Sequence, residues 1–298
     1  MTGPTPGLSY AIVTPVRDEG DGLARLAADV VEQTVEPLAW VIVDTGSRDA
    51  TVEVARRLAG EIPWVTAVSC DSRAAERGGP IVRAFVAGID AISASSLTPD
   101  VVVKLDGDLG LGRDYFARQL KAFADDARLG ISSGVCHELR GDRWVPFWGT
   151  RDHVWGAARA YRAECLAAVR PLPERQGWDE IDALKARLLG WKTGVVADLL
   201  FKHYRREGER DGQWRRWADK GASAYYMGYR PSYLVARTLY RARREPSALI
   251  MLLAYAKAAI ARSQRLPDES VRRSLREQQR LRVLGARMRE ARGLGARS

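Results

Sequence analysis

The stretch VVVKLDGD at residues 101–108 joins an apolar run directly to two acidic residues. Residues 101–105 have the length and composition of a buried strand. Two carboxylates separated by one glycine, Asp106 and Asp108, can reach one divalent cation from an exposed turn, and oxygen ligands suit Mg²⁺ and Mn²⁺. Asp and Gly also favour plain solvated turns. The stretch alone therefore predicts a strand and leaves metal binding and turn formation as alternatives.

Apolar runs and helical periodicity alternate on both sides of this stretch. Further strands are predicted at residues 10–15, 40–43, 65–69 and 130–135. Helices are predicted at residues 22–33, 49–58, 81–94, 114–124 and 181–189. This alternation predicts an α/β fold with a mostly parallel central sheet flanked by helices. Ligands of such sheets bind beyond the carboxyl ends of the strands, which is where Glu19, Asp44 and Asp106 fall.

The composition is that of a folded protein from a reducing compartment. The 298 residues are 46% hydrophobic, enough for a large core. The three cysteines are scattered without a CxxC pair, which argues against a disulfide scaffold or a zinc site. The first residues lack the basic and apolar pattern of a signal peptide. We therefore expect a cytoplasmic protein.

The charge is unevenly distributed along the chain. Residues 202–298 contain 24 Lys/Arg and 9 Asp/Glu, whereas residues 1–201 contain 23 and 28. This shift predicts a domain over residues 1–204 and a basic, aromatic-rich helical extension over residues 205–298, with an amphipathic helix at 269–291. The apolar run at 247–260 is too short to span a bilayer. A basic extension suits an anionic partner such as a membrane surface, and no nucleic-acid motif is present.

Four more motifs occur in a characteristic order: TPVRDE at 14–19, VDTGSRDAT at 43–51, GWDE at 177–180 and GW at 190–191. Together with the Asp-Gly-Asp motif, they resemble glycosyltransferase family 2 over roughly residues 9–205. The family consists of inverting sugar transferases with the GT-A fold. A set of motifs in order is far more specific than any one of them.

The resemblance implies a role for each matching residue. It implies a nucleotide-sugar pocket lined by Pro15, Arg17, Glu19, Asp44, Arg83 and Asp106. It implies Mn²⁺ or Mg²⁺ held by Asp106, Asp108 and His203. The catalytic base would be Asp179 or its neighbour Glu180. The residue types alone leave structural alternatives: Asp44 capping a turn, Asp179 as a helix N-cap and His203 as a hydrogen-bonded structural histidine.

Two stretches of the extension carry weaker resemblances. Residues 213–217 match the Q-x-x-R-W motif of processive family members, which implies that Arg216 and Trp217 contact the diphosphate or the acceptor; packing of an aromatic helix is the alternative. The stretch YYMGYRPSY at 225–233 resembles members that build surface polysaccharides or glycolipids. That implies a saccharide or polyprenyl-linked acceptor at an anionic inner leaflet, with a solvated tail or a homodimer interface as alternatives.

These observations predict a metal-dependent, inverting glycosyltransferase that uses a nucleotide sugar, with UDP as the expected nucleotide. One alternative is a nucleotidyltransferase that makes the activated sugar. Such enzymes carry a Gly-rich loop after the first strand, which the segment RDEG at 17–20 does not match. The other alternative is a non-catalytic nucleotide-binding module, against which the retained Asp106, Asp108 and Asp179 argue.

Overall fold

The computed structural model describes residues 7–71, 78–140, 142–146, 153–204, 212–243 and 245–280. It divides into two compact units, Met1–Arg205 and Arg206–Ser298. The strands of the first unit are β1 (Tyr10–Val16), β2 (Ala39–Asp44), β3 (Val65–Ser69), β4 (Val101–Leu105), β5 (Leu109–Leu111), β6 (Leu129–Arg140), β7 (Arg143–Pro146), β8 (Ala158–Arg162) and β9 (Lys192–His203). Its helices are α1 (Gly20–Val31), α2 (Thr51–Glu61), α3 (Gly79–Ala94), α4 (Tyr115–Asp125), α5 (Ala163–Val169) and α6 (Trp178–Leu188).

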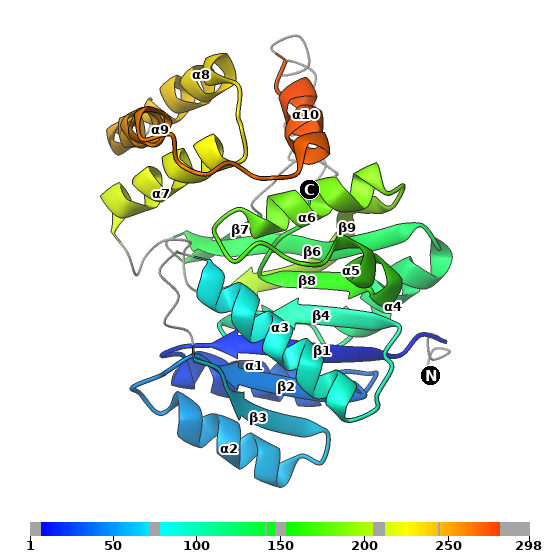
Figure 1. Cartoon of the computed structure of the whole chain (residues 1–298). Helices are drawn as coiled ribbons and strands as arrows, with labels where there is room; N and C mark the ends of the chain where they lie inside the picture. The colour runs from blue at the N-terminus through cyan, green and yellow to red at the C-terminus, as the bar shows by residue number, and fades with distance from the viewer. Residues whose placement is uncertain are drawn as a thin grey trace. The chain divides into compact units, whose positions relative to one another are not determined.

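The strands form one sheet in the order β3-β2-β1-β4-β8-β6-β9-β5, and β7 pairs with β6 (Figure 1). The β3-β2-β1-β4 half is parallel throughout. Beyond β4 the sheet is mixed: β8 is antiparallel to both β4 and β6, and β9 is parallel to β6 but antiparallel to β5. The parallel half therefore brings the carboxyl ends of β1, β2 and β4 to the same edge.

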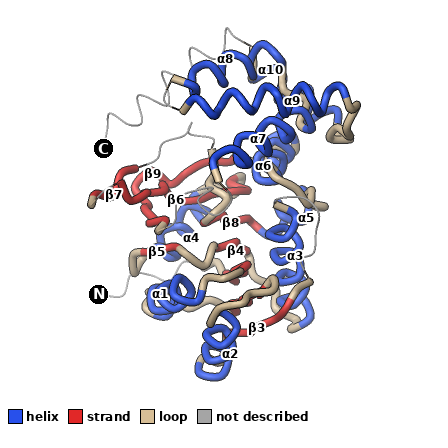
Figure 2. Tube along the Cα trace, turned by 90° about the vertical axis from the view of Figure 1, so that its left-hand side faces the viewer, coloured by secondary structure: helices blue, strands red, loops and turns tan. Residues whose placement is uncertain are grey.

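Helices cover both faces of the sheet (Figure 2). One face packs against α1, α2 and α4, and the other packs against α3, α5 and α6. Strand β1 alternates between the two cores: Tyr10 and Ile12 join the first, whereas Ala11 and Val13 join the second. All seven residues of β1 are buried, as expected for a strand covered on both faces.

The predicted strands at 65–69 and 101–105 are confirmed with their boundaries, and those near residues 10, 40 and 130 are confirmed with longer ones. Strands β5, β7, β8 and β9 were not predicted. Helix α6 begins at Trp178, so Gly177, with a φ of +88°, is its N-cap. The N-cap alternative for Asp179 is therefore wrong, because Asp179 lies inside the first turn.

The second unit is helical. It contains α7 (Gln213–Tyr226), α8 (Pro231–Ala242), a short 3₁₀ helix η1 (Pro246–Leu249), α9 (Ile250–Ile260) and α10 (Glu269–Gln278). Helix α7 packs along α9, and η1 packs against α8. The predicted helix at 269–291 ends at Gln278, and its last residues, 281–291, lie outside the described part of the chain. Among the described helices none has both the length and the apolar composition needed to cross a membrane.

Candidate active site at the carboxyl edge of the sheet

The Asp-Gly-Asp turn lies between β4 and β5, at the edge where the parallel strands end. The backbone N–H of Asp106 donates to the carbonyl of Ala157 (2.8 Å), which ties the turn to the segment before β8. Helix α1 packs closely on the other side: a Cβ atom on Gly22 would lie 2.9 Å from the carbonyl oxygen of Gly107. The turn is therefore held between two backbone segments, and its carboxylates have a defined position.

The strand register brings His203 to this turn from ninety-five residues further along the chain. Leu109 of β5 is paired with His203 of β9, and the N–H of Tyr204 donates to the carbonyl of Asp108 (3.1 Å). His203 Nε2 lies 3.3 Å from Asp108 Oδ1. One ligand atom from each of Asp106, Asp108 and His203 lies within 4.8 Å of the others.

This cluster attracts positive charge. Burial lowers the pKa of His203, but its hydrogen bonds with Asp108 and Cys136 and the negative charges of Asp108 and Asp106 outweigh burial and raise the pKa to about 10. A metal binds the neutral imidazole, so a metal and a proton would compete for His203. Two carboxylates and one imidazole within reach of one point form a donor set that fits Mn²⁺ or Mg²⁺.

Two further acidic residues follow the neighbouring strands β1 and β2. A Cβ atom on Gly107 would lie 2.5 Å from Glu19 Oε2, so the Glu19 carboxylate lies against the Asp-Gly-Asp turn. Asp44 is buried, and its carboxylate accepts hydrogen bonds from the N–H groups of Gly46 (3.0 Å) and Ser47 (3.2 Å). Asp44 therefore does cap the following turn, as the structural alternative predicted. Its contact with a nucleotide stays a prediction.

Pro15 and Arg17 lie at the carboxyl end of β1. Pro15 is buried in β1 opposite Val43, and Arg17 is exposed just beyond the strand. Arg83 of α3 forms an ion pair with Glu174, five residues before Asp179. Nearby, Gly78, the residue before α3, forms an isolated bridge with Arg175, so α3 and its N-terminal end are joined to the segment before α6 at two points. Arg83 is therefore connected to the segment that leads into Asp179.

Asp179 and the Asp-Gly-Asp turn meet at Gly156. A Cβ atom on Gly156 would lie 3.0 Å from Asp179 Oδ2, so this carboxylate lies against the Gly156 backbone. The carbonyl of the same glycine accepts a hydrogen bond from Lys104 Nζ (2.9 Å), and Lys104 forms an ion pair with Asp106. Asp106 and Asp179 are thus linked through the Lys104 side chain and Gly156.

A buried ion pair between Arg159 and Asp182 holds the first turn of α6 in place. The side chains of Arg159 and Asp182 are both fully buried and paired, and the Tyr161 hydroxyl also donates to Asp182. Arg159 Nη2 donates in addition to the backbone carbonyl of Asp179 (2.9 Å). This pair holds the backbone of Asp179, while the Asp179 and Glu180 side chains are both only partly buried.

Sequence reasoning missed Lys104, Gly156 and Trp178 as parts of the site. Lys104 is 2% exposed, and its ammonium lies 5.9 Å from the centre of the Trp178 ring. The available signal was the lysine itself, because a charged residue inside the apolar run VVVKL needs a buried partner. Gly156 carries no comparable signal.

Arg216 and Trp217 belong to the second unit, where α7 begins. Arg216 forms an ion pair with Glu245, and Gln213 Nε2 donates to the same carboxylate. Trp217 is 4% exposed, and the Arg216 guanidinium stacks 5.0 Å from its ring centre. The packing alternative thus accounts for the buried position of Trp217, and donor or acceptor contact stays a prediction for both residues.

Residues 11–153 match the family described as Glycosyl transferase family 2. A search of the curated proteins found no match. Among solved structures, the mannosyltransferase PcManGT from Pyrobaculum calidifontis, in complex with GDP-Man and Mn²⁺, is 18% identical with a TM-score of 0.56, over 99% of this chain and 88% of that one.

Two other solved structures are similar over less of their own length. GalNAc-T7 with UDP, GalNAc and Mn²⁺ is 13% identical with a TM-score of 0.58, over 87% of this chain and 56% of that one. S. aureus TarS 1-349 in complex with UDP is 15% identical with a TM-score of 0.52, over 73% of this chain and 65% of that one. These likenesses confirm the predicted GT-A fold.

Proposed function

Because the chain carries a family 2 glycosyltransferase domain in residues 11–153, we propose that it transfers a sugar, with inversion, from a nucleoside-diphosphate sugar to a hydroxyl group. The observation that carries this proposal is the cluster of Asp106, Asp108 and His203, with Asp106 linked through Lys104 and Gly156 to Asp179. Three stretches of chain, around residues 106, 179 and 203, contribute to it. Domain 1–204 would be catalytic, and residues 205–298 would extend it.

The nucleotide would bind along the ends of β1, β2 and β4. Asp44 would contact the base, Asp106 the ribose, and Pro15, Arg17, Glu19 and Arg83 would line the pocket. PcManGT holds GDP-Man and GalNAc-T7 holds UDP, which supports a nucleotide-sugar donor. We expect a UDP-sugar from the family resemblance.

Asp106, Asp108 and His203 would hold Mn²⁺ or Mg²⁺. The bound ion would supply positive charge that stabilises the diphosphate leaving group. PcManGT and GalNAc-T7 were both solved with Mn²⁺, which supports this donor set. His203 must be neutral to act as a ligand, so metal binding would compete with protonation of its ring.

Asp179 would act as the base. A hydroxyl group is a weak nucleophile near neutral pH, and a carboxylate within hydrogen-bond reach can take its proton as the anomeric carbon is attacked. The Asp179 carboxylate lies against Gly156 and therefore close to Lys104 and Asp106, which favours it over Glu180. One displacement inverts the anomeric centre, so no second nucleophilic carboxylate is needed.

The acceptor would be a saccharide or a polyprenyl-linked saccharide, used in assembling a cell-surface polysaccharide or glycolipid. The basic extension would serve this acceptor through Arg216 and Trp217 and would contact the anionic inner face of the membrane from the cytoplasm. A homodimer interface is the alternative use of the same surface.

The test is a donor screen with the full chain and Mn²⁺. UDP-, GDP- and dTDP-sugars are incubated with the protein, and the released nucleotide is identified. We expect one nucleoside diphosphate to accumulate, and NMR of the transfer product to show an inverted anomeric centre. Release of pyrophosphate would identify a nucleotidyltransferase instead. The absence of both release and nucleotide-induced thermal stabilisation would reject the proposed function.

Paired variants assign the base. We expect Asp179→Asn to lower the transfer rate by at least about 100-fold while nucleotide binding with Mn²⁺ persists. Glu180→Gln is the matched control and should retain most of the rate. The opposite pattern would assign the base to Glu180. Near-normal turnover in both variants would remove this pair from the mechanism.

A further inference from the structure

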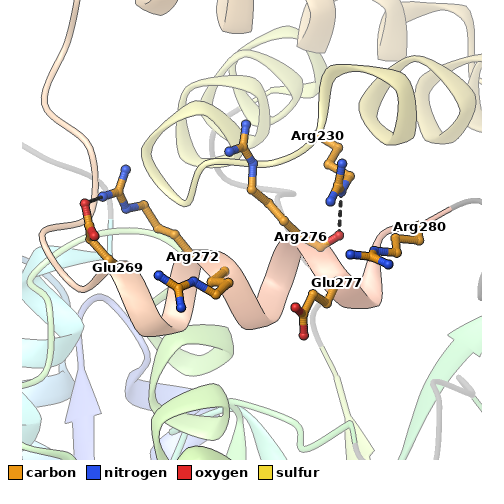
Figure 3. Close-up of a pocket in the computed structure, with 7 residues that line it drawn as sticks. Arg230, Glu269, Arg272, Arg276, Glu277 and Arg280 are labelled. Carbon is orange, nitrogen blue, oxygen red and sulfur yellow. Dashed lines mark hydrogen bonds and ion pairs between the residues drawn. The ribbon is translucent and has the colours of Figure 1, made fainter.

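Helix α10 and the residue that precedes α8 form a pocket of about 340 Å³ within the second unit (Figure 3). Five arginines line it: Arg230, Arg272, Arg273, Arg276 and Arg280. Its other lining residues are Glu269 and Glu277. Pockets for small organic ligands are mostly apolar, whereas every side chain lining this one is charged. Five guanidinium groups against two carboxylates give its lining a net positive charge.

The sequence of α10 explains why the arginines gather. Val271 and Leu275 are buried and form the apolar face of the helix. Arg272 and Arg276 lie four residues apart on one face of α10, about 6 Å along the helix axis. Arg280 follows four residues later, just beyond Gln278, the last residue of the helix. Arg276 and Arg280 are exposed. The helix therefore carries a row of guanidinium groups beside its buried face.

Arg230 adds a fourth cation to the end of this row. Its backbone N–H donates to Gln279 Oε1 (2.8 Å), and its Nε donates to the carbonyl of Arg276 (2.6 Å). These two bonds fix Arg230 against the C-terminal end of α10 and leave its two terminal nitrogens available. Figure 3 shows Arg230, Arg276 and Arg280 at this end of the helix, with Glu277 pointing away from Arg230.

The carboxylates of the pocket do not balance these charges. Glu269 pairs with Arg272 (3.1 Å) at the opposite end of α10. Within the described residues, no carboxylate pairs with Arg273, Arg276 or Arg280. Attraction of cations to the C-terminal end of a helix acts over the last turn only, so it does not account for Arg272 and the full width of the pocket. Cations held this close repel one another, and a bound anion relieves that repulsion.

We propose that this arginine pocket, formed by Arg230, Arg272, Arg273, Arg276 and Arg280, binds a phosphate group. Guanidinium groups match phosphate oxygens with pairs of parallel charge-assisted hydrogen bonds, and arginine suits this better than lysine does. The phosphate comes either from a small soluble molecule or from the headgroup of an anionic phospholipid. The proposal concerns binding in the second unit and does not depend on sugar transfer.

The experiment compares the full-length protein with two double variants that carry the same charge change. Arg276→Gln/Arg280→Gln removes two exposed pocket arginines and leaves the hydrogen bonds of Arg230 in place. Arg56→Gln/Arg57→Gln removes two exposed arginines of α2 as the matched control. Circular dichroism melting establishes that all three proteins are folded. Binding is measured by calorimetry with inorganic phosphate in EDTA, so that no divalent cation recruits phosphate elsewhere. Sedimentation is measured with vesicles of phosphatidylcholine alone and of equal parts phosphatidylcholine and phosphatidylglycerol.

We expect the pocket variant to bind at least about tenfold more weakly than the wild type and the control. If the pocket variant loses binding to inorganic phosphate, the ligand is a soluble phosphate compound. If it loses binding only to the anionic vesicles, the ligand is a lipid headgroup. Binding of neither probe by the wild type would overturn the proposal. Equal weakening in the pocket variant and the α2 control would also overturn it, because net charge would then explain the binding.

Discussion

The ammonium group of Lys104 forms an ion pair with Asp106 and donates a hydrogen bond to the carbonyl of Gly156 (2.9 Å). One buried side chain thus holds the first acidic residue of the Asp-Gly-Asp turn and the glycine that faces Asp179. Lys104 points out of an otherwise apolar strand, and the two oxygens satisfy its charge. The proposed base and the proposed metal site therefore depend on the same lysine for their relative position.

Replacing this lysine should disturb both groups. In Lys104→Met, Asp106 loses its ion pair and the Gly156 carbonyl loses its donor. We expect the free energy of unfolding to fall by about 1–3 kcal/mol and the transfer rate to fall by about tenfold or more because the base is less well positioned. Urea denaturation and initial-rate assays measure the two effects. Lys121→Met, at an exposed lysine paired with Asp125 on α4, is the control. A Lys104→Met protein as stable as this control would contradict the argument.

The buried pair of Arg159 and Asp182 supports α6 in the same way. Asp182→Asn would leave the Arg159 guanidinium buried without a counter-charge, since both side chains are fully buried. We expect a loss of about 3–5 kcal/mol in the free energy of unfolding, measured by urea denaturation. Asp125→Asn, which breaks the exposed pair with Lys121, should cost less than about 1 kcal/mol. Similar losses in the two variants would show that burial adds nothing to the pair.

The strands that are buried on both faces could be predicted from the sequence. The runs YAIVTPV, AWVIVD and VVVKL are apolar at almost every position, which predicts buried parallel strands. An acidic residue ends the second run and closely follows each of the other two. The parallel order of these strands then brings Glu19, Asp44 and Asp106 to one edge. This part of the candidate site follows from hydrophobic patterning and connection rules alone.

The part of the sheet beyond β4, which contains the antiparallel strand pairs, could not be predicted in this way. Strand β9 is largely half-buried or exposed, with Leu199 and Phe201 as its buried residues, so its apolar pattern is weak. The position of His203 beside Asp108 depends on the pairing of β9 with β5, a contact between distant segments that no local pattern specifies. The contact of Asp179 with Gly156 likewise arises from tertiary packing. The family resemblance predicted the residues, and only the fold supplies their contacts.

The hydrogen bonds between Ser9 and Asp100, just before β4, should make the free energy of unfolding depend on pH. The N–H and hydroxyl groups of Ser9 both donate to Asp100 Oδ2 (2.8 and 2.7 Å), and these hydrogen bonds lower the pKa of Asp100 from its ordinary value. A carboxyl group whose pKa is lower in the folded state stabilises the fold above its unfolded pKa, and this contribution is lost as the pH falls through the folded pKa. Asp100→Asn should therefore lower the free energy of unfolding by up to about 1 kcal/mol near neutral pH.

The difference between Asp100→Asn and the wild type should close as the pH falls through the lowered pKa of Asp100, because the carboxyl group then becomes uncharged like the amide. Urea denaturation across the acid range measures it, with Asp125→Asn as the control for a lost surface charge. A difference that stays constant from neutral to acid pH would show that the hydrogen bonds to Ser9 do not discriminate between the charged and neutral carboxyl group.

Two glycines in helices predict opposite effects of the same substitution. A Cβ atom on Gly22 would lie 2.9 Å from the Gly107 carbonyl oxygen and 3.3 Å from Asp108 Cα, both backbone atoms that cannot rotate away. Gly22→Ala should therefore push α1 from the Asp-Gly-Asp turn, with a loss of about 1–3 kcal/mol in stability and a weaker response to Mn²⁺. Gly60 in α2 has nothing within 4 Å, so Gly60→Ala should stabilise the protein by about 0.5–1 kcal/mol. Thermal melting with and without Mn²⁺ compares the two variants. If Gly22→Ala were as stable and as responsive to Mn²⁺ as Gly60→Ala, close packing of α1 would not be what positions the acidic turn.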